Sequence, residues 1–300
     1  MKNILIGITY ASIFGLTFMF TKVGISYAQP ISILAFRFSF AFFGVLILYL
    51  LKIIKVRMRK IFNKNMLYLI LMQPILGFSF EIVGIQYVKS FEAGIFVATI
   101  PIIVAVVSNL FLNEKPNFRQ IIYIFLGFFG VIYIQYMNYS GELSFSIFGS
   151  ALIFVSVFCA AMFNIFSRKV SKLMYPSEIT FLMMLVGFVF FMSWYLISLL
   201  LSNNINDFFL PFKNINSTLA ILYLGFIASI LGFFLVNHNL KHFPAHVSSI
   251  FANIATIVSI LAGVIFLGEK IYLHHIIGSI MIMIGVYGVV SNNKNRNTAQ

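Results

Sequence analysis

Long apolar runs alternate with short polar stretches along nearly the whole chain. Each run has about twenty residues, enough for an α-helix to cross the ~30 Å hydrocarbon core of a bilayer. The runs lack the residue-by-residue alternation of barrel strands, and a helix pairs its backbone groups internally in lipid. The pattern therefore predicts ten transmembrane helices, spans one to ten. They cover residues 3–21, 31–51, 66–88, 93–112, 119–137, 147–166, 178–201, 216–237, 246–267 and 271–290.

Composition excludes a water-soluble globule. Of the 300 residues, 61% are hydrophobic and 9% are charged, and the mean hydropathy is +1.02. Soluble domains average about 25% charged and 45–50% apolar residues, so much of this surface must face lipid. The first run is too long for a signal peptide, and we expect it to be a retained helix. We therefore predict an all-α integral membrane protein.

The basic residues lie mainly in alternate loops. The net charge is +13, yet the densest basic stretch, residues 52–64, separates two apolar runs and has no zinc-ligand spacing or aromatic stacking pattern. Lipid is therefore an expected partner, and nucleic acid is not. If the N-terminus is cytoplasmic, fifteen Lys and Arg residues fall inside and four outside. This positive-inside bias predicts that both termini are cytoplasmic.

One charged corner, a short polar sequence that follows a long apolar run, occurs twice. The sequence FLNEK at residues 111–115 returns as FLGEK at residues 266–270, an offset of 155. The same offset aligns Gly77-Phe78 with Gly232-Phe233, and Gly130-Val131 with Gly285-Val286. In the first span of each half the offset is 147, which places TKV at 21–23 on RKV at 168–170. We interpret Glu114 and Glu269 as structural corners of a repeat.

Each half of the chain holds five spans, so the second copy must enter the membrane from the opposite side. Such inverted repeats build two half-sites around a central cavity in secondary transporters and support alternating access. The predicted organisation has four parts: a first repeat at 1–137, a connection at 138–146, a second repeat at 147–290, and a polar, disordered tail at 291–300.

Three features resemble the EamA-type members of the drug/metabolite transporter superfamily, over nearly the whole chain. They are PISILAFRFSFAF at 30–42 with Arg37, the two Glu-Lys corners, and the glycine-bearing runs LGFFGVIYI at 126–134 and IGSIMIMIGVYGVV at 277–290. The resemblance implies ten helices in two repeats, transport of small organic solutes and location in a bacterial inner (plasma) membrane. It also implies a cavity near spans one, three, four, six, eight and nine. The second half departs from the first because it has no arginine matching Arg37, only Glu178 near the membrane edge.

Two ionisable residues within spans are candidates for substrate binding or coupling. A charge at a helix centre costs about 2.5–3.5 kcal/mol on insertion scales, so it persists where it faces protein or water. Arg37 is an anion partner, a gate, or a structural arginine that snorkels outward or binds helix-end carbonyls; we favour the structural role. Glu81 either exchanges a proton or pairs with a solute ammonium, or forms a salt bridge with Arg37 or Lys89. The second copy has Val236 at the position of Glu81.

Neutral polar residues are weaker candidates. Tyr10, Thr17, Asn164 and Asn253 either line a cavity or form hydrogen bonds between packed helices. Three histidines recur every four residues, but Pro244 interrupts the run, so we expect no metal centre. His238 remains a candidate for a proton-sensitive contact.

The resemblance makes export of an amino acid or a related amphipathic metabolite the leading hypothesis. Uptake or exchange of a nucleotide-like or cofactor-like metabolite is the alternative, and it requires more cationic groups than Arg37. A membrane scaffold or a membrane-embedded enzyme is the alternative of another class. An enzyme needs a cluster of ligands or a nucleophile with its base, and the spans show none. We therefore expect a small-molecule substrate, no cofactor and no enzymatic activity, while the oligomeric state stays open.

Overall fold

The computed structural model describes residues 2–57, 64–88, 90–137, 146–267 and 270–298. Within these ranges the secondary structure is helical, and ten helical spans are long and apolar enough to cross a membrane. The predicted all-α fold of ten transmembrane helices is thereby confirmed.

The first repeat contains spans one to five. Spans one, two and five are the single helices α1, α2 and α7, whereas spans three and four are each divided into shorter segments. The segments are α1 (Lys2–Ile25), α2 (Pro30–Leu50), α3 (Lys64–Ile70), η2 (Leu71–Leu76), α4 (Gly77–Gly84), α5 (Ser90–Ala98), α6 (Ile100–Leu112) and α7 (Phe118–Met137).

The second repeat contains spans six to ten and has the same division. Spans six, seven and ten are the single helices α8, α9 and α14, and spans eight and nine are divided. The segments are α8 (Ile147–Val170), α9 (Pro176–Leu201), α10 (Ile215–Leu222), η5 (Tyr223–Gly232), α11 (Phe233–His242), α12 (Ala245–Ser249), η6 (Ile250–Asn253), α13 (Ile254–Leu267) and α14 (Leu273–Thr298). Two short 3₁₀ turns, Ile205–Asp207 and Leu210–Phe212, lie between spans seven and eight. Helix α14 continues to Thr298, so the prediction of a disordered tail was wrong; an existing helix gains one hydrogen bond per added residue.

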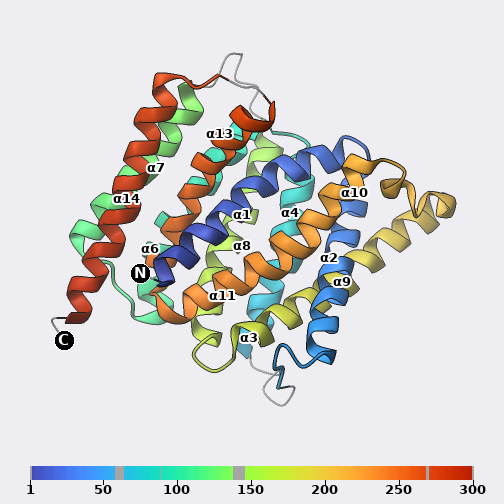
Figure 1. Cartoon of the computed structure of the whole chain (residues 1–300), viewed down its shortest axis with the longest axis horizontal. Coiled ribbons are helices and arrows are strands. Elements are labelled where there is room, and N and C mark those ends of the chain that lie inside the picture. The colour runs from blue at the N-terminus through green and yellow to red at the C-terminus, as the bar shows by residue number, and fades with distance from the viewer. Residues whose placement is uncertain (1, 58–63, 89, 138–145, 268–269, 299–300) are drawn as a thin grey trace.

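The two repeats are interleaved. The most extensive helix contacts join α7 to α14, α2 to α9, α4 to α8 and α1 to α13, and each of these pairs combines one helix from each repeat. Figure 1 shows α7 and α14 side by side at one edge of the molecule and α2 with α9 toward the other. A Cβ atom on Gly130 would lie 2.8 Å from the carbonyl oxygen of Gly278, so glycine permits the close approach of α7 and α14.

The molecule has two ends along the helix axes, and we name them by their connections. The terminal face carries the start of α1, the end of α14, and the α6–α7, α8–α9 and α11–α12 connections. The distal face carries the α1–α2 and α9–α10 connections. Because each span and its counterpart are five spans apart along the chain, each span of the second repeat crosses in the opposite sense to its counterpart.

Spans three and eight both depart from regular α-helix near their centres. In span three, Gln73 leaves the helical region (φ −151°, ψ 124°) before Pro74, which lacks an N–H and cannot continue the hydrogen-bond ladder. In span eight the helix continues through η5, which is wound as a π-helix. The offset of 155 places η2 within η5, so each repeat departs from regular α-helix at the same position, by a kink in span three and by wider winding in span eight.

Candidate functional site

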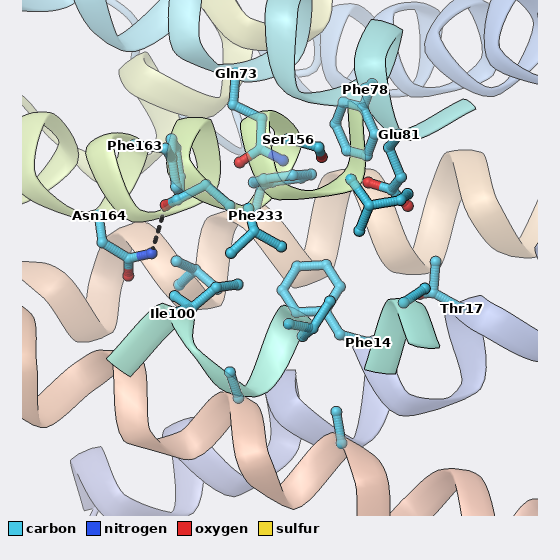
Figure 2. A pocket seen from close by; sticks show the side chains of 18 of the residues that line it. Phe14, Thr17, Gln73, Phe78, Glu81, Ile100, Ser156, Phe163, Asn164 and Phe233 are labelled. Carbon is cyan, nitrogen blue, oxygen red and sulfur yellow. Dashed lines mark hydrogen bonds between the residues drawn. The ribbon is translucent and has the colours of Figure 1, made fainter. Parts of the chain in front are cut away.

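A cavity of about 200 Å³ lies between seven of the ten spans. Its walls come from spans one, two, three, four, six, eight and nine, and Figure 2 shows many of the side chains that face it. The lining comprises Tyr10, Phe14, Thr17, Thr21, Arg37, Gln73, Phe78, Glu81, Ile85, Ala93, Val97, Ile100, Ile153, Ser156, Val157, Ala160, Phe163, Asn164, Phe233, Val236, Ser249, Ala252 and Ala255.

The two repeats contribute to this lining at matching positions. An offset of 147 pairs positions on spans one and six, and an offset of 155 pairs positions on spans three and four with those on spans eight and nine. Six such pairs face the cavity: Tyr10 and Val157, Thr17 and Asn164, Phe78 and Phe233, Glu81 and Val236, Val97 and Ala252, and Ile100 and Ala255. The repeat found in the sequence therefore corresponds to two half-sites around one cavity.

The cavity extends toward the distal face. Thr21, Ile85 and Ala93, at the distal ends of spans one, three and four, are part of its lining. On the other side the lining ends at Tyr10 and Ser249. Since α1 begins at Lys2, about two helical turns separate Tyr10 from the terminal face.

Arg37 turns into the protein from α2, with 3% of its surface exposed. Its Nε donates a hydrogen bond of 2.8 Å to Ser229 Oγ on η5. The guanidinium carbon lies 4.6 Å from the ring centre of Phe78 and 5.7 Å from that of Phe38, in the range of cation–π contacts. The side chain therefore neither snorkels outward nor binds helix-end carbonyls, and its charge faces the cavity.

Glu81 lies on α4, one turn beyond Phe78, and faces the same cavity as Arg37. The two charges act on one another electrostatically, but they do not form an ion pair or share a hydrogen bond among the described residues. Figure 2 shows the carboxylate beside Phe78, at the opposite end of the group from Asn164. The expected alternative partner, Lys89, lies outside the described residues. One carboxylate and one guanidinium thus face a common space.

Aromatic rings form the centre of the wall. Phe233 makes edge-to-face contacts with Phe14, Phe163 and Phe78, at ring-centre distances of 5.6, 5.7 and 6.1 Å. Such contacts hold the rings in fixed relative orientations. The middle of the cavity is therefore apolar, and its charged groups lie toward the distal side.

Three of the predicted neutral residues line the cavity while also bonding to the backbone. Tyr10 Oη donates to Ser248 O at 2.6 Å, Thr17 Oγ1 to the carbonyl four residues earlier at 3.1 Å, and Asn164 Nδ2 to Ala160 O at 2.8 Å. Of these three bonds, the one from Tyr10 joins two helices, whereas those of Thr17 and Asn164 lie within their own helices.

Two predicted residues lie away from the lining. His238 is in the last turns of α11, near the terminal face, with its ring centre 4.5 Å from that of His242. Asn253 is buried and packs against span five, because a Cβ on Gly127 would lie 3.0 Å from Asn253 Nδ2. Within the described residues no group of three or more His, Cys, Asp or Glu side chains could hold a metal ion.

Sequence reasoning did not single out Gln73, Ser229, Phe163 or Phe233. Gln73 precedes a proline within an apolar run, which is a usable signal for a broken helix that exposes polar groups. The structural corner Glu114 bonds to Arg168 and to the backbone of α12. Its repeat counterpart Glu269 lies outside the described residues.

The sequence matches the EamA-like transporter family over residues 1–136 and 147–291. The chain belongs to this family. It is 36% identical over 281 residues to the uncharacterized transporter YcxC of Bacillus subtilis, which covers 94% of this chain and 90% of YcxC. An uncharacterized transporter of Archaeoglobus fulgidus is 26% identical over 291 residues, covering 96% of this chain and 98% of its own.

A crystal structure found among solved proteins has the same fold. It aligns with a TM-score of 0.78 over 96% of this chain and 98% of that chain, at 13% sequence identity. The resemblance to EamA-type transporters stated from the sequence is confirmed, and the chain is a multi-pass membrane transporter. In this EamA protein the cavity is bordered by the six spans that the resemblance implied, and Arg37 adds span two.

Proposed function

We propose that this transporter exports a small organic metabolite, an amino acid or a related amphipathic compound, by alternating access around the central cavity. The observation that carries the proposal is one cavity, built by both repeats, in which a carboxylate and a guanidinium lie beside aromatic rings. Glu81 pairs with a solute ammonium group, and Arg37 attracts a carboxylate. The rings of Phe14, Phe163 and Phe233 receive the apolar part of the solute.

Cavity size and charge support a small dipolar solute over a nucleotide-like one. The volume of about 200 Å³ is below the ~300–1,000 Å³ of sites for drug-sized ligands. Arg37 is the one basic side chain among the described lining residues. A phosphate group carries more charge and more acceptor oxygens than one guanidinium can satisfy, and this one already donates to Ser229.

Glu81 is also suited to couple transport to protons. Its carboxylate has no hydrogen-bond donor among the described residues, so a proton and a solute ammonium compete for the same oxygens. Release of the solute in exchange for a proton is then one step of the cycle. The positive-inside bias supports a cytoplasmic terminal face, and we assign the protein to the bacterial plasma membrane.

Comparative metabolite profiling tests the proposal. Wild type, Glu81→Gln and a control, Asp207→Asn, are expressed in a bacterial host, and intracellular and medium pools are measured by mass spectrometry. Asp207 lies in the connection between spans seven and eight, so its variant removes one negative charge away from the cavity. We expect one class of amphipathic metabolite to leave cells that express wild type or the control, and to stay inside with Glu81→Gln.

Other outcomes are equally informative. A class that accumulates inside cells expressing the wild type would show uptake and overturn the export proposal. Wild-type transport rates and wild-type pH dependence in Glu81→Gln would remove Glu81 from the cycle. Counterflow of the identified metabolite in proteoliposomes then separates transport by this protein from an effect on host metabolism.

A further inference from the structure

A network of side chains joins several spans at the terminal face, beneath the cavity. Glu114 follows span four, and its Oε1 lies 2.8 Å from Arg168 Nε, near the end of span six. Its Oε2 accepts a hydrogen bond of 2.9 Å from the backbone N–H of Ala245, the first residue of span nine. One carboxylate therefore joins spans four, six and nine.

Arg168 extends the network to span eight. Its Nη1 donates to the carbonyl oxygens of Leu240 and Lys241, at 2.8 and 2.9 Å, in the last turn of α11. These carbonyls have no partner within their own helix, as is usual for a helix end. The two charged side chains thus tie together four spans that surround the cavity.

A second layer of contacts lies nearer the cavity. Tyr10 Oη donates to Ser248 O at 2.6 Å, which joins span one to span nine at the end of the cavity lining. The short helix α12 is therefore held at Ala245 by Glu114 and at Ser248 by Tyr10. Asn239 Nδ2 donates to Asn3 O at 2.8 Å and joins span eight to span one.

Glu114 has a glutamate, Glu269, at its matched position, which lies outside the described residues, but three other matched positions on the distal side have a different chemistry. The repeat offsets place Thr21 at the position of Arg168, Val157 at that of Tyr10 and Ala93 at that of Ser248. All three line the cavity, and among the described residues their side chains form no hydrogen bond with one another. The distal half has the bond from Tyr223 Oη to Ile13 O, which lies at a different repeat position.

We propose that Glu114 and Arg168, with Tyr10 on their cavity side, form a latch that holds the terminal face closed, and that its release opens the cavity to that face. The inference rests on the proposed function in one respect: alternating access requires a path to each face. The latch joins spans one, four, six, eight and nine, which are five of the seven spans around the cavity, so a path that parts these spans at the terminal face breaks its contacts. Charge-assisted hydrogen bonds between elements that must separate are a common basis for two-state closure.

The exposure of the latch suits a contact that is made and broken. The side chains of Arg168 and Glu114 are 14% and 15% exposed, so water can replace their bonds as the spans part. A fully buried pair would leave two uncompensated charges when it separates. Glu178 offers a contrast on the same face: its carboxylate accepts from the backbone N–H groups of Arg57 and Tyr175, and it joins spans two and seven instead.

Cysteine accessibility tests the latch without knowledge of the substrate. In a Cys159→Ala background, Asn164→Cys places one thiol at the terminal end of the cavity. A membrane-impermeant thiol reagent is applied to right-side-out and to inside-out vesicles. We expect labelling from the distal side in this background, because the structure is closed at the terminal face.

Glu114→Gln should raise the rate of labelling from the terminal side by about tenfold, the effect of losing one charge-assisted hydrogen bond. Glu178→Gln, the matched substitution on the same face, should leave that rate unchanged.

A second variant keeps the test decisive. Arg168→Lys retains the charge, but an ammonium cannot bond to Glu114 and to the carbonyls of Leu240 and Lys241 in the geometry of the guanidinium. It should therefore open the terminal face as Glu114→Gln does. Unchanged terminal-side labelling in both variants would overturn the latch, whether or not a transported metabolite has been found. Increased labelling in a protein that moves no metabolite would support the latch and count against the proposed function alone.

Discussion

Spans three and eight depart from regular α-helix at the same repeat position, but they differ in backbone and in chemistry. Span three has a kink at Gln73, span eight has the π-wound segment η5, and both present a phenylalanine to the cavity, Phe78 and Phe233. One turn further on, span three has Glu81 and span eight has Val236. At the position of Pro74 in span three, span eight has Ser229, which holds the guanidinium of Arg37. The repeat thus preserves the walls of the cavity, while each half supplies a different part of its polar chemistry.

Moving the carboxylate from span three to span eight should have the largest effect on transport. Glu81→Gln should abolish or uncouple transport, because it removes the one acidic side chain in the described lining. Adding Val236→Glu to this variant should not restore transport, since Arg37 is held over Phe78 beside position 81. Proteoliposome flux measured over a pH series checks both results. Restored, pH-dependent flux in the double variant would mean that the two half-sites are equivalent.

Replacing the cation should have the next largest effect. Arg37→Lys keeps a positive charge, but an ammonium cannot present the planar fork that matches a carboxylate. We expect the KM of a carboxylate-bearing solute to rise about tenfold, with a smaller change for its amide analogue. Parallel kinetics with the two solutes provide the measurement. Equal changes for both would remove the carboxylate from the contacts of Arg37.

The matched phenylalanines offer a symmetric test. Phe78→Leu removes the ring over which Arg37 lies, worth about 0.5–2 kcal/mol, and should weaken binding of the solute carboxylate by several fold. Phe233→Leu leaves that contact in place and removes the ring in contact with Phe14 and Phe163, so it should change the preference for the apolar part. Competition by solutes with graded side chains distinguishes the two. Identical profiles would contradict separate roles.

The smallest effect is expected at Ser229. Ser229→Ala removes one hydrogen bond to a charged group, about 1.5–3 kcal/mol at most, while the rings of Phe38 and Phe78 still hold Arg37. The KM should rise a few fold, and Ser229→Thr should behave like the wild type because it keeps the hydroxyl. If the alanine variant matches the wild type, the stacking on Phe78 alone positions the guanidinium.

The ten spans were predictable from the long apolar runs, and the repeat was predictable from the charged corner that occurs twice. Arg37, Glu81, Tyr10, Thr17 and Asn164 were found as polar groups within those runs, and the structure brings all five to one cavity. Their roles stay predictions until transport is measured.

Other features gave less signal. The kink in span three is marked by Pro74, whereas the π-wound segment YLGFIASILG of span eight contains no proline and nothing else in its sequence marks the winding. Phe163 and Phe233 cannot be told from lipid-facing rings in a chain with 37 phenylalanines. Asn253 was selected for its polarity alone, which does not reveal which side of a helix faces the cavity, and it packs on span five instead.

The interleaving of the repeats has a consequence for biosynthesis. Span five packs on span ten, and span two on span seven, so the first half of the chain is synthesised before its packing partners exist. Ser229, the hydrogen-bond partner of Arg37, is synthesised 192 residues after it. Arg168 and Ala245, the partners of Glu114, also follow it in the chain. Charges in a newly inserted half are costly while they face lipid. The five-helix half is therefore a unit of sequence and not of folding, because Arg37 and Glu114 complete their contacts only when spans eight and nine enter the bilayer.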